Sequence, residues 1–213
     1  MRAFKPRLFL AALMALGLAA CGSGNKTTSV PDDMSLGNPN AKVTVVEYAS
    51  VACPVCGHWY KEVYPTFKTK YIDTGKIHYV FREMLVGGDS EVTTAASGFL
   101  LARCAGKDKY FAVTDAIFRS QPDQPSDPGL FSDPKGTLER IAQSAGLNEN
   151  QFIACVSDGA ALTALQNRVV ANSKIDNVNS TPTFVINGKS MEPGYHPLAD
   201  IDKAIADAQA SAK

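Results

Sequence analysis

Residues 43–56 read Val-Thr-Val-Val-Glu-Tyr-Ala-Ser-Val-Ala-Cys-Pro-Val-Cys, and this stretch decides the fold. Its first six residues are mostly β-branched or apolar, which is typical of a buried strand. Pro54 suits the first turn of a helix, where the missing N–H of proline does no harm. The sequence therefore predicts that a strand gives way to a helix at Cys53.

The flanking sequence extends this unit into a sheet. We expect the helix to continue with a kink at Pro65 and a second strand to cover 77–81, which makes a strand–helix–strand unit with parallel strands. Residues 183–186 predict another strand, and Asn187-Gly188 is a strong hairpin turn that leads to a further short strand. An amphipathic helix over 198–208 closes the chain.

Between these two parts the sequence predicts helices, from about residue 86 to residue 174. Asn148 is able to cap a helix that contains Phe152 and Cys155. The stretch 121–136 contains four prolines and predicts a loop. The segments that form the sheet are thus separated in the chain by a helical segment.

The N-terminus reads as an export signal. A basic start, an uncharged apolar run over 8–18 and two small residues are typical of a secretory signal peptide over 1–20. The run is about half the length that spans a bilayer, so a permanent membrane helix is the weaker interpretation. Leu18-Ala19-Ala20-Cys21 resembles the bacterial lipobox, which implies that Cys21 carries a lipid. A plain signal peptide with a chance cysteine is the alternative.

Residues 22–40 are rich in Gly, Ser, Asn, Thr and Pro and lack apolar periodicity. We therefore expect 21–40 to be a lipidated N-terminus followed by a flexible tether.

Length and composition fit one globular domain, alone or with an insertion, since the 213 residues are 45% hydrophobic and 20% charged. The formal net charge is zero and no basic stripe runs along the chain, so we expect no nucleic-acid partner. No glycine-rich nucleotide loop is present, so no nucleotide cofactor is implied.

Four cysteines remain once Cys21 is assigned to the lipid, and an exported protein can form disulfides. Three pairings are possible, and the sequence does not choose among them, although spacing suggests Cys53 with Cys56 and Cys104 with Cys155. In the chain-entropy model a Cys104–Cys155 disulfide, which closes a long loop, would stabilise the fold by about 4 kcal/mol, and a Cys53–Cys56 disulfide, which closes a short one, by about 2 kcal/mol. The long pair therefore suits a structural role and the short pair a chemical one.

The position of Cys53 favours a reactive thiolate. The free N–H groups and the dipole at a helix N-terminus stabilise negative charge, and the thiolate is the species that attacks disulfides. Cys56 lies one turn further along, where it can resolve a mixed disulfide. Glu47, if it points inward, would be a carboxylate with a raised pKa that exchanges a proton with Cys56. An outward, solvated Glu47 is the alternative.

The sequence resembles the DsbA-like branch of the thioredoxin superfamily. The resemblance is carried by 45–48 leading into Cys53-Pro54-Val55-Cys56, by Ala145-Gly146-Leu147 with Phe152 and Cys155, and by 180–188, which reads Ser-Thr-Pro-Thr-Phe-Val-Ile-Asn-Gly. Together these segments cover nearly the whole chain after the tether.

This resemblance implies an α/β protein with a thioredoxin fold, in two parts over 41–85 and 175–213, interrupted by an α-helical insertion over 86–174. It also implies particular site residues: a redox-active Cys53–Cys56 pair that needs no other cofactor, a buried Glu47, a Cys104–Cys155 bridge, a cis Pro182, and substrate contacts by Pro54, Val55, Thr181 and Pro182. Backbone groups of Thr181 would then be free to pair with an extended substrate chain.

The function implied is the introduction of disulfides into reduced, exported proteins by a monomer that a DsbB-type membrane partner reoxidises. Val55 and Thr181 depart from the strongest oxidants of the family, which carry histidine and valine there, so an isomerase or reductase is an alternative. A non-catalytic peptide-binding lipoprotein is another. Cys53 and Cys56 are also half of a zinc site, but the spacing of His58 does not favour a third ligand.

Overall fold

The computed structural model describes residues 1, 32–124 and 127–211. The predicted lipidation site Cys21 and the predicted signal peptide after Met1 lie outside the described residues. In chain order the elements are β1 Met34–Gly37, β2 Thr44–Ala49, α1 Pro54–Glu62, α2 Tyr64–Phe67, the π-helical η1 Lys68–Ile72, β3 His78–Glu83, α3 Asp89–Cys104, α4 Lys107–Arg119, α5 Pro134–Ser144, α6 Glu149–Val156, α7 Gly159–Asp176, β4 Thr183–Ile186, β5 Lys189–Ser190 and α8 Leu198–Ser211.

The described strands form one sheet in the order β1-β3-β2-β4-β5. The predicted strand–helix–strand unit is confirmed, because β2 pairs parallel to β3 with Val46 opposite Val80. Strand β4 pairs antiparallel to β2, which places Phe184 opposite Glu47. The hairpin at Asn187-Gly188 is confirmed too, since β4 and β5 are antiparallel neighbours. The segment that carries the cysteines therefore follows a central strand.

The prediction of a tether through residue 40 is wrong for its last part. Met34–Gly37 is the edge strand β1, which pairs antiparallel to β3 with Met34 opposite Phe81. Met34 is buried against the core. A four-residue strand shows too little alternation to be seen in the sequence, and its pairing partner lies more than forty residues further along the chain.

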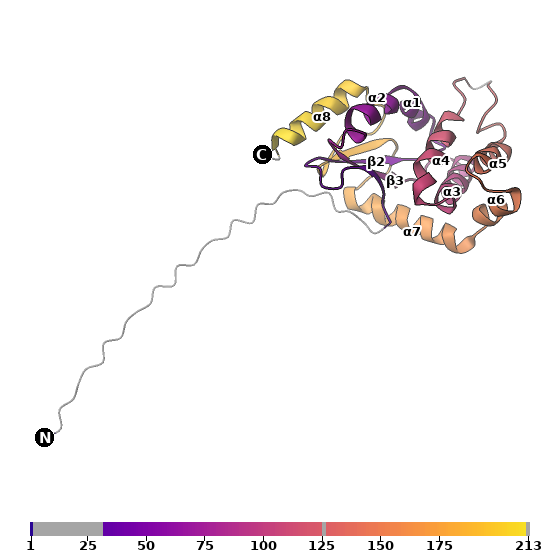
Figure 1. Cartoon of the computed structure of the whole chain (residues 1–213), viewed down its shortest axis with the longest axis horizontal. Helices are drawn as coiled ribbons and strands as arrows, with labels where there is room; N and C mark the ends of the chain where they lie inside the picture. Colours follow the sequence, from indigo (N-terminus) through magenta and orange to yellow (C-terminus); the bar gives the residue numbers. More distant parts are fainter. Residues whose placement is uncertain (2–31, 125–126, 212–213) are drawn as a thin grey trace.

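Side chains that alternate along the strands build a core on each face of the sheet. Glu47, Tyr79 and Phe184 are buried on the face that carries α1, α2 and α8, whereas Tyr48 and Val80 are buried on the other face. Figure 1 shows α7 passing along this second face and α3 to α6 gathered beside the sheet. The kink predicted at Pro65 takes the form of a break, because α1 ends before α2 begins.

A disulfide joins Cys104, at the end of α3, to Cys155 in α6; the two cysteines are 51 positions apart in the chain, and their Cα–Cα distance is 5.9 Å. Asn148 caps α6 in a capping box, as predicted. Glu83 at the end of β3 accepts hydrogen bonds from Arg103 of α3 at 2.6 Å and from Arg168 of α7 at 3.3 Å. These contacts attach the helices to the sheet that carries the cysteine segment.

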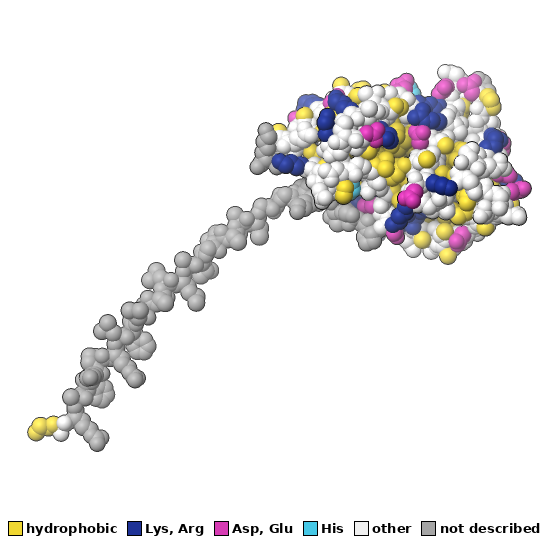
Figure 2. Space-filling view, viewed as in Figure 1, with side chains coloured by type: hydrophobic (Ala, Val, Ile, Leu, Met, Phe, Trp, Pro, Cys, Tyr) yellow, Lys and Arg dark blue, Asp and Glu magenta, His cyan; other side chains and the backbone are white. Residues whose placement is uncertain are grey.

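Charged side chains of both signs are interspersed on the face shown in Figure 2. Among the described residues, none of the helices is both long enough and apolar enough to cross a membrane.

Candidate active site

Cys53 is the N-cap of α1, and its sulfur therefore faces the free N–H groups of the first turn. The backbone is extended at this residue, and the Sγ atom accepts a hydrogen bond from the N–H of Cys56 at 3.4 Å. Pro54 stands in the first turn without loss of a helical hydrogen bond. Both thiols are free, with Cys53 half-buried and Cys56 buried. Only Cys53 is thus placed to meet a large partner.

The two thiols have pKa values shifted in opposite directions. Hydrogen bonding from the Cys56 side chain lowers the pKa of Cys53 from 9.0 to about 6. The backbone N–H groups of Cys56 and Val55 also lower this pKa, whereas burial opposes the shift. Burial, together with the hydrogen bond to Cys53 and the charge on Cys53, raises the pKa of Cys56 well above 9.0. At neutral pH the pair therefore holds a thiolate at Cys53 and a thiol at Cys56.

Glu47 lies on β2 with its carboxyl group fully buried. One carboxyl oxygen, Oε2, accepts a hydrogen bond from the hydroxyl of Tyr79 at 2.6 Å, whereas Oε1 has no partner among the described residues. Burial raises the pKa of Glu47 from 4.5 to about 8, with the Tyr79 hydrogen bond opposing and the charge of Cys53 adding to the rise. The inward orientation makes Glu47 a group that can exchange protons near neutral pH.

The segment before β4 lies directly against Cys53. The Thr181–Pro182 peptide bond is cis, and the Cys53 thiol lies 3.6 Å from the carbonyl oxygen of Thr181, to which it can donate. Pro54 and Val55 separate the two cysteines, and Val55 is 43% exposed. The structure thus brings together the predicted residues of the cysteine segment and of the segment before β4. Cys104 and Cys155 lie apart from them, in the helical segment.

His58 and His196, near this site, have other partners. His58 lies 3.3 Å from Glu62, and the imidazole Nε2 of His196 lies 2.7 Å from the backbone oxygen of Glu192. Within the described part of the chain, no group of three or more His, Cys, Asp or Glu is arranged to hold a metal ion.

Two residues of the site were missed by sequence reasoning. Tyr79 supplies the hydrogen bond to Glu47, and its hydroxyl also lies 3.2 Å from that of Tyr60. Gln121 reaches back from the segment after α4, and its side-chain amide donates to the backbone oxygen of Val51 at 2.8 Å. Strand alternation could have placed Tyr79 on the core face. Nothing in the sequence marks Gln121 as a site residue, because it lies in a predicted loop and its partner Val51 is 70 residues away in the chain.

The chain belongs to the thioredoxin family, since the family model described as Thioredoxin matches residues 29–207. A relative from Rickettsia bellii, named as a protein-disulfide oxidoreductase, is 33% identical over 180 residues, which are 84% of this chain and 66% of that protein. The chain therefore spans slightly less than two thirds of the length of that relative.

Solved structures share the fold. The structure of alpha-DsbA1 from Wolbachia pipientis aligns with 86% of this chain and 94% of its own, with a TM-score of 0.71 and a sequence identity of 26%. BdbD from Bacillus subtilis, in its oxidised form, is 20% identical with a TM-score of 0.67, over 86% of this chain and 96% of that one. The predicted α/β class and thioredoxin-type fold are confirmed.

Proposed function

We propose that this chain is a protein-disulfide oxidoreductase that introduces disulfide bonds into exported proteins. The observation that carries the proposal is the opposite shift of the two thiol pKa values, which leaves Cys53 as a stabilised thiolate. A disulfide whose reduction releases a stabilised thiolate is the more oxidising, because its reduced form is favoured. The names of the relatives from Rickettsia bellii and Wolbachia pipientis support the same activity.

The oxidised protein carries a Cys53–Cys56 disulfide. A client thiolate attacks the Cys53 sulfur, the Cys53–Cys56 bond breaks, and Cys56 leaves as a thiolate that takes a proton from Glu47. A second thiolate of the same client then attacks the client sulfur of the mixed disulfide and releases Cys53 as a thiolate. The client loses two electrons and the cysteine pair gains them. A membrane partner of the DsbB type would reoxidise the pair, and the chain would act as a monomer.

Glu47 suits this proton exchange because its pKa of about 8 keeps it largely protonated at neutral pH. Thr181 and Pro182, beside Cys53, would hold the client chain while the mixed disulfide exists, with Pro54 and Val55 on the other side.

The reduction potential tests the direction of electron flow. A pKa of about 6 for Cys53 lies between those of DsbA, about 3.5, and thioredoxin, about 7. We therefore expect a potential between about −120 mV and about −270 mV, the values of those two proteins. It can be measured by equilibration with glutathione and Trp59 fluorescence. A value at or below that of thioredoxin would assign a reductase instead.

A pair of variants tests whether the cysteines are catalytic. Cys53→Ser should abolish insulin reduction, whereas Cys104→Ser should retain it and lower the melting temperature. Full activity of Cys53→Ser would contradict the proposal and would favour a non-catalytic peptide-binding protein.

We also propose that residues 1–20 direct export and that a lipid on Cys21 holds the domain at the membrane, facing the periplasm. The wild-type protein should then partition into detergent, whereas Cys21→Ser should remain in the aqueous phase. A wild-type protein found in the aqueous phase would exclude the anchor.

A further inference from the structure

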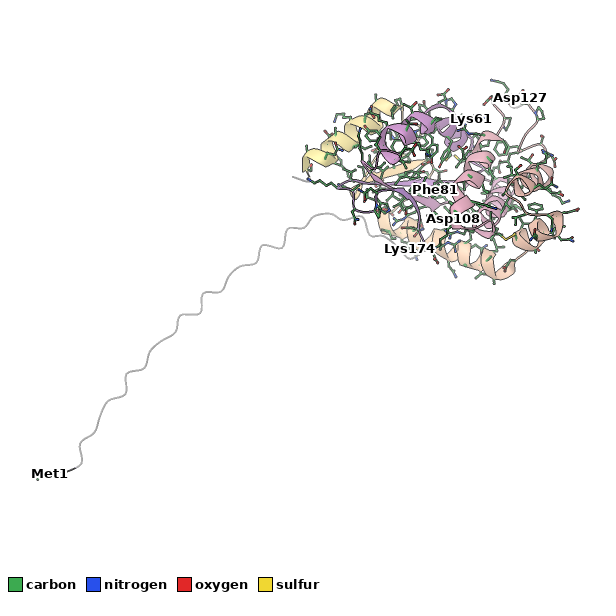
Figure 3. The ribbon with its side chains drawn as sticks, viewed as in Figure 1. Met1, Lys61, Phe81, Asp108, Asp127 and Lys174 are labelled. Atoms are coloured by element: carbon green, nitrogen blue, oxygen red, sulfur yellow. A yellow bond between two sulfur atoms is a disulfide. The ribbon has the colours of Figure 1, made fainter. Side chains whose placement is uncertain are left out.

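A groove lies between α1 and the segment that follows α4. It has a volume of about 350 Å³ and is lined on the α1 side by Pro54, Val55, His58 and Lys61. Its other wall is the segment 121–123. In Figure 3, Lys61 on α1 and Asp127, further along the loop after α4, lie at the same end of the molecule.

The far wall of the groove is attached to α1 and to the cysteine segment by hydrogen bonds. The Lys61 amino group donates to the backbone oxygen of Gln121 at 2.6 Å and to the Asp123 carboxylate at 2.5 Å. The buried amide of Gln121 also donates to Val51, two residues before Cys53. A Cβ atom at Gly57 would overlap this amide, so the wall packs directly on α1. The groove is therefore a preformed part of the site.

The groove begins one residue from the reactive sulfur, because Pro54 and Val55 are the residues between the cysteines. Thr181 lies against Cys53, and Thr181 and Pro182 do not line the groove. A client cysteine bonded to Cys53 carries its chain away in two directions. A client chain with one flank along Thr181 would have its other flank on the side of Val55, whose side chain is exposed and lines the groove.

The chemistry of the groove favours an uncharged occupant. Its cation Lys61 is already paired with Asp123, and His58 lies beside Glu62, so the basic side chains among the described lining residues each have an acidic neighbour. Pro54, Val55 and Pro122 supply apolar walls. A volume of about 350 Å³ is near the lower end for ligand pockets and suits one or two side chains.

We propose that this groove is a client subsite that selects an apolar side chain, such as leucine or methionine, close to the client cysteine. The proposal rests on the proposed oxidoreductase function and names the client feature that the site recognises. It assigns to Pro122 and Asp123, in the helical segment, a role in choosing clients.

Single-cysteine peptides test this subsite. Peptides with Leu, Ala or Asp at one position near the cysteine, on either flank, are reacted with the oxidised full chain, and the second-order rate constants are compared. We expect Leu to react about tenfold faster than Asp on one flank only, as burial of part of an aliphatic side chain would give. Equal rates for the three peptides at every position would overturn the proposal.

Two groove variants and one matched control assign the preference to this place. Pro122→Asp should reduce the preference for Leu to less than about twofold, whereas Pro128→Asp, the same change at an exposed site of the same loop outside this groove, should retain it. Asp123→Lys, which removes the carboxylate partner of Lys61 and adds a second cation, should make the Asp peptide the faster one. An unchanged preference in both groove variants would overturn the proposal.

Exchange with glutathione distinguishes a failure of the proposed subsite from a failure of the proposed oxidoreductase function. If the wild-type protein exchanges with glutathione but shows no peptide preference, only the subsite is wrong. If it exchanges with neither glutathione nor any peptide, the oxidoreductase function fails and the subsite fails with it.

Discussion

Replacing Glu47 by Gln should make the stability of the reduced protein less dependent on pH. The carboxyl group is fully buried and has one hydrogen-bond donor, Tyr79, among the described residues. Burial raises its pKa from 4.5 to about 8, more than the Tyr79 hydrogen bond lowers it. Glutamine has nearly the same shape and carries no charge at any pH, so it retains the packing and removes the titration.

The sign follows from proton linkage. The folded pKa lies above the unfolded one, so the folded state holds the proton more tightly, and this stabilisation is fully present below about pH 4.5. It is lost as the pH rises from there to about 8, where the buried carboxylate must carry its charge. Raising a pKa from 4.5 to about 8 corresponds to a loss of about 5 kcal/mol in the free energy of unfolding.

Urea unfolding of the reduced proteins at pH 5 and pH 8.5, followed by Trp59 fluorescence, measures this loss. Because wild type and Glu47→Gln both contain Cys53, comparing them at the same pH cancels most of the contribution that the titration of Cys53 makes to the free energy of unfolding. Between the two pH values the stability of Glu47→Gln relative to wild type should rise by about 3 to 5 kcal/mol. In Tyr79→Phe, which lacks the hydrogen bond that lowers the pKa, the loss should extend to higher pH. A Glu47→Gln difference that is the same at both pH values would show that the pKa of Glu47 is not raised.

Three further predictions concern the thiols and the packing around them. Joint replacement of Cys104 and Cys155 by Ser should lower the free energy of unfolding by about 4 kcal/mol in denaturant titrations, with thiol exchange retained; unchanged stability would contradict it. Gly57→Ala should destabilise the fold by about 1 to 3 kcal/mol, because its Cβ would overlap the Gln121 amide. The loss should be smaller in a Gln121→Ala background, and strictly additive losses in the double variant would show that the two side chains do not clash. Alkylation of Cys53 should have its midpoint near pH 6, and a midpoint near pH 9 would show an unactivated thiol.

Much of the fold was predictable because its signals are local. The apolar run before Cys53, the Asn187-Gly188 turn and the Asn148 cap each act within a few residues, and all three occur as predicted. The edge strand Met34–Gly37 was not predictable, because it depends on pairing with the distant β3 rather than on its own pattern.

By itself the sequence determined which chemistry is available: two cysteines one helical turn apart, at the point where a strand meets a helix N-terminus. That information is local, since N-cap geometry depends on neighbouring residues alone. The tertiary structure decided how this chemistry is tuned. Burial of Glu47, its contact with Tyr79 and the position of Gln121 against Val51 join residues far apart in the chain. Desolvation, which shifts the pKa values of Glu47 and Cys56 most, exists only once the helices have closed over the sheet.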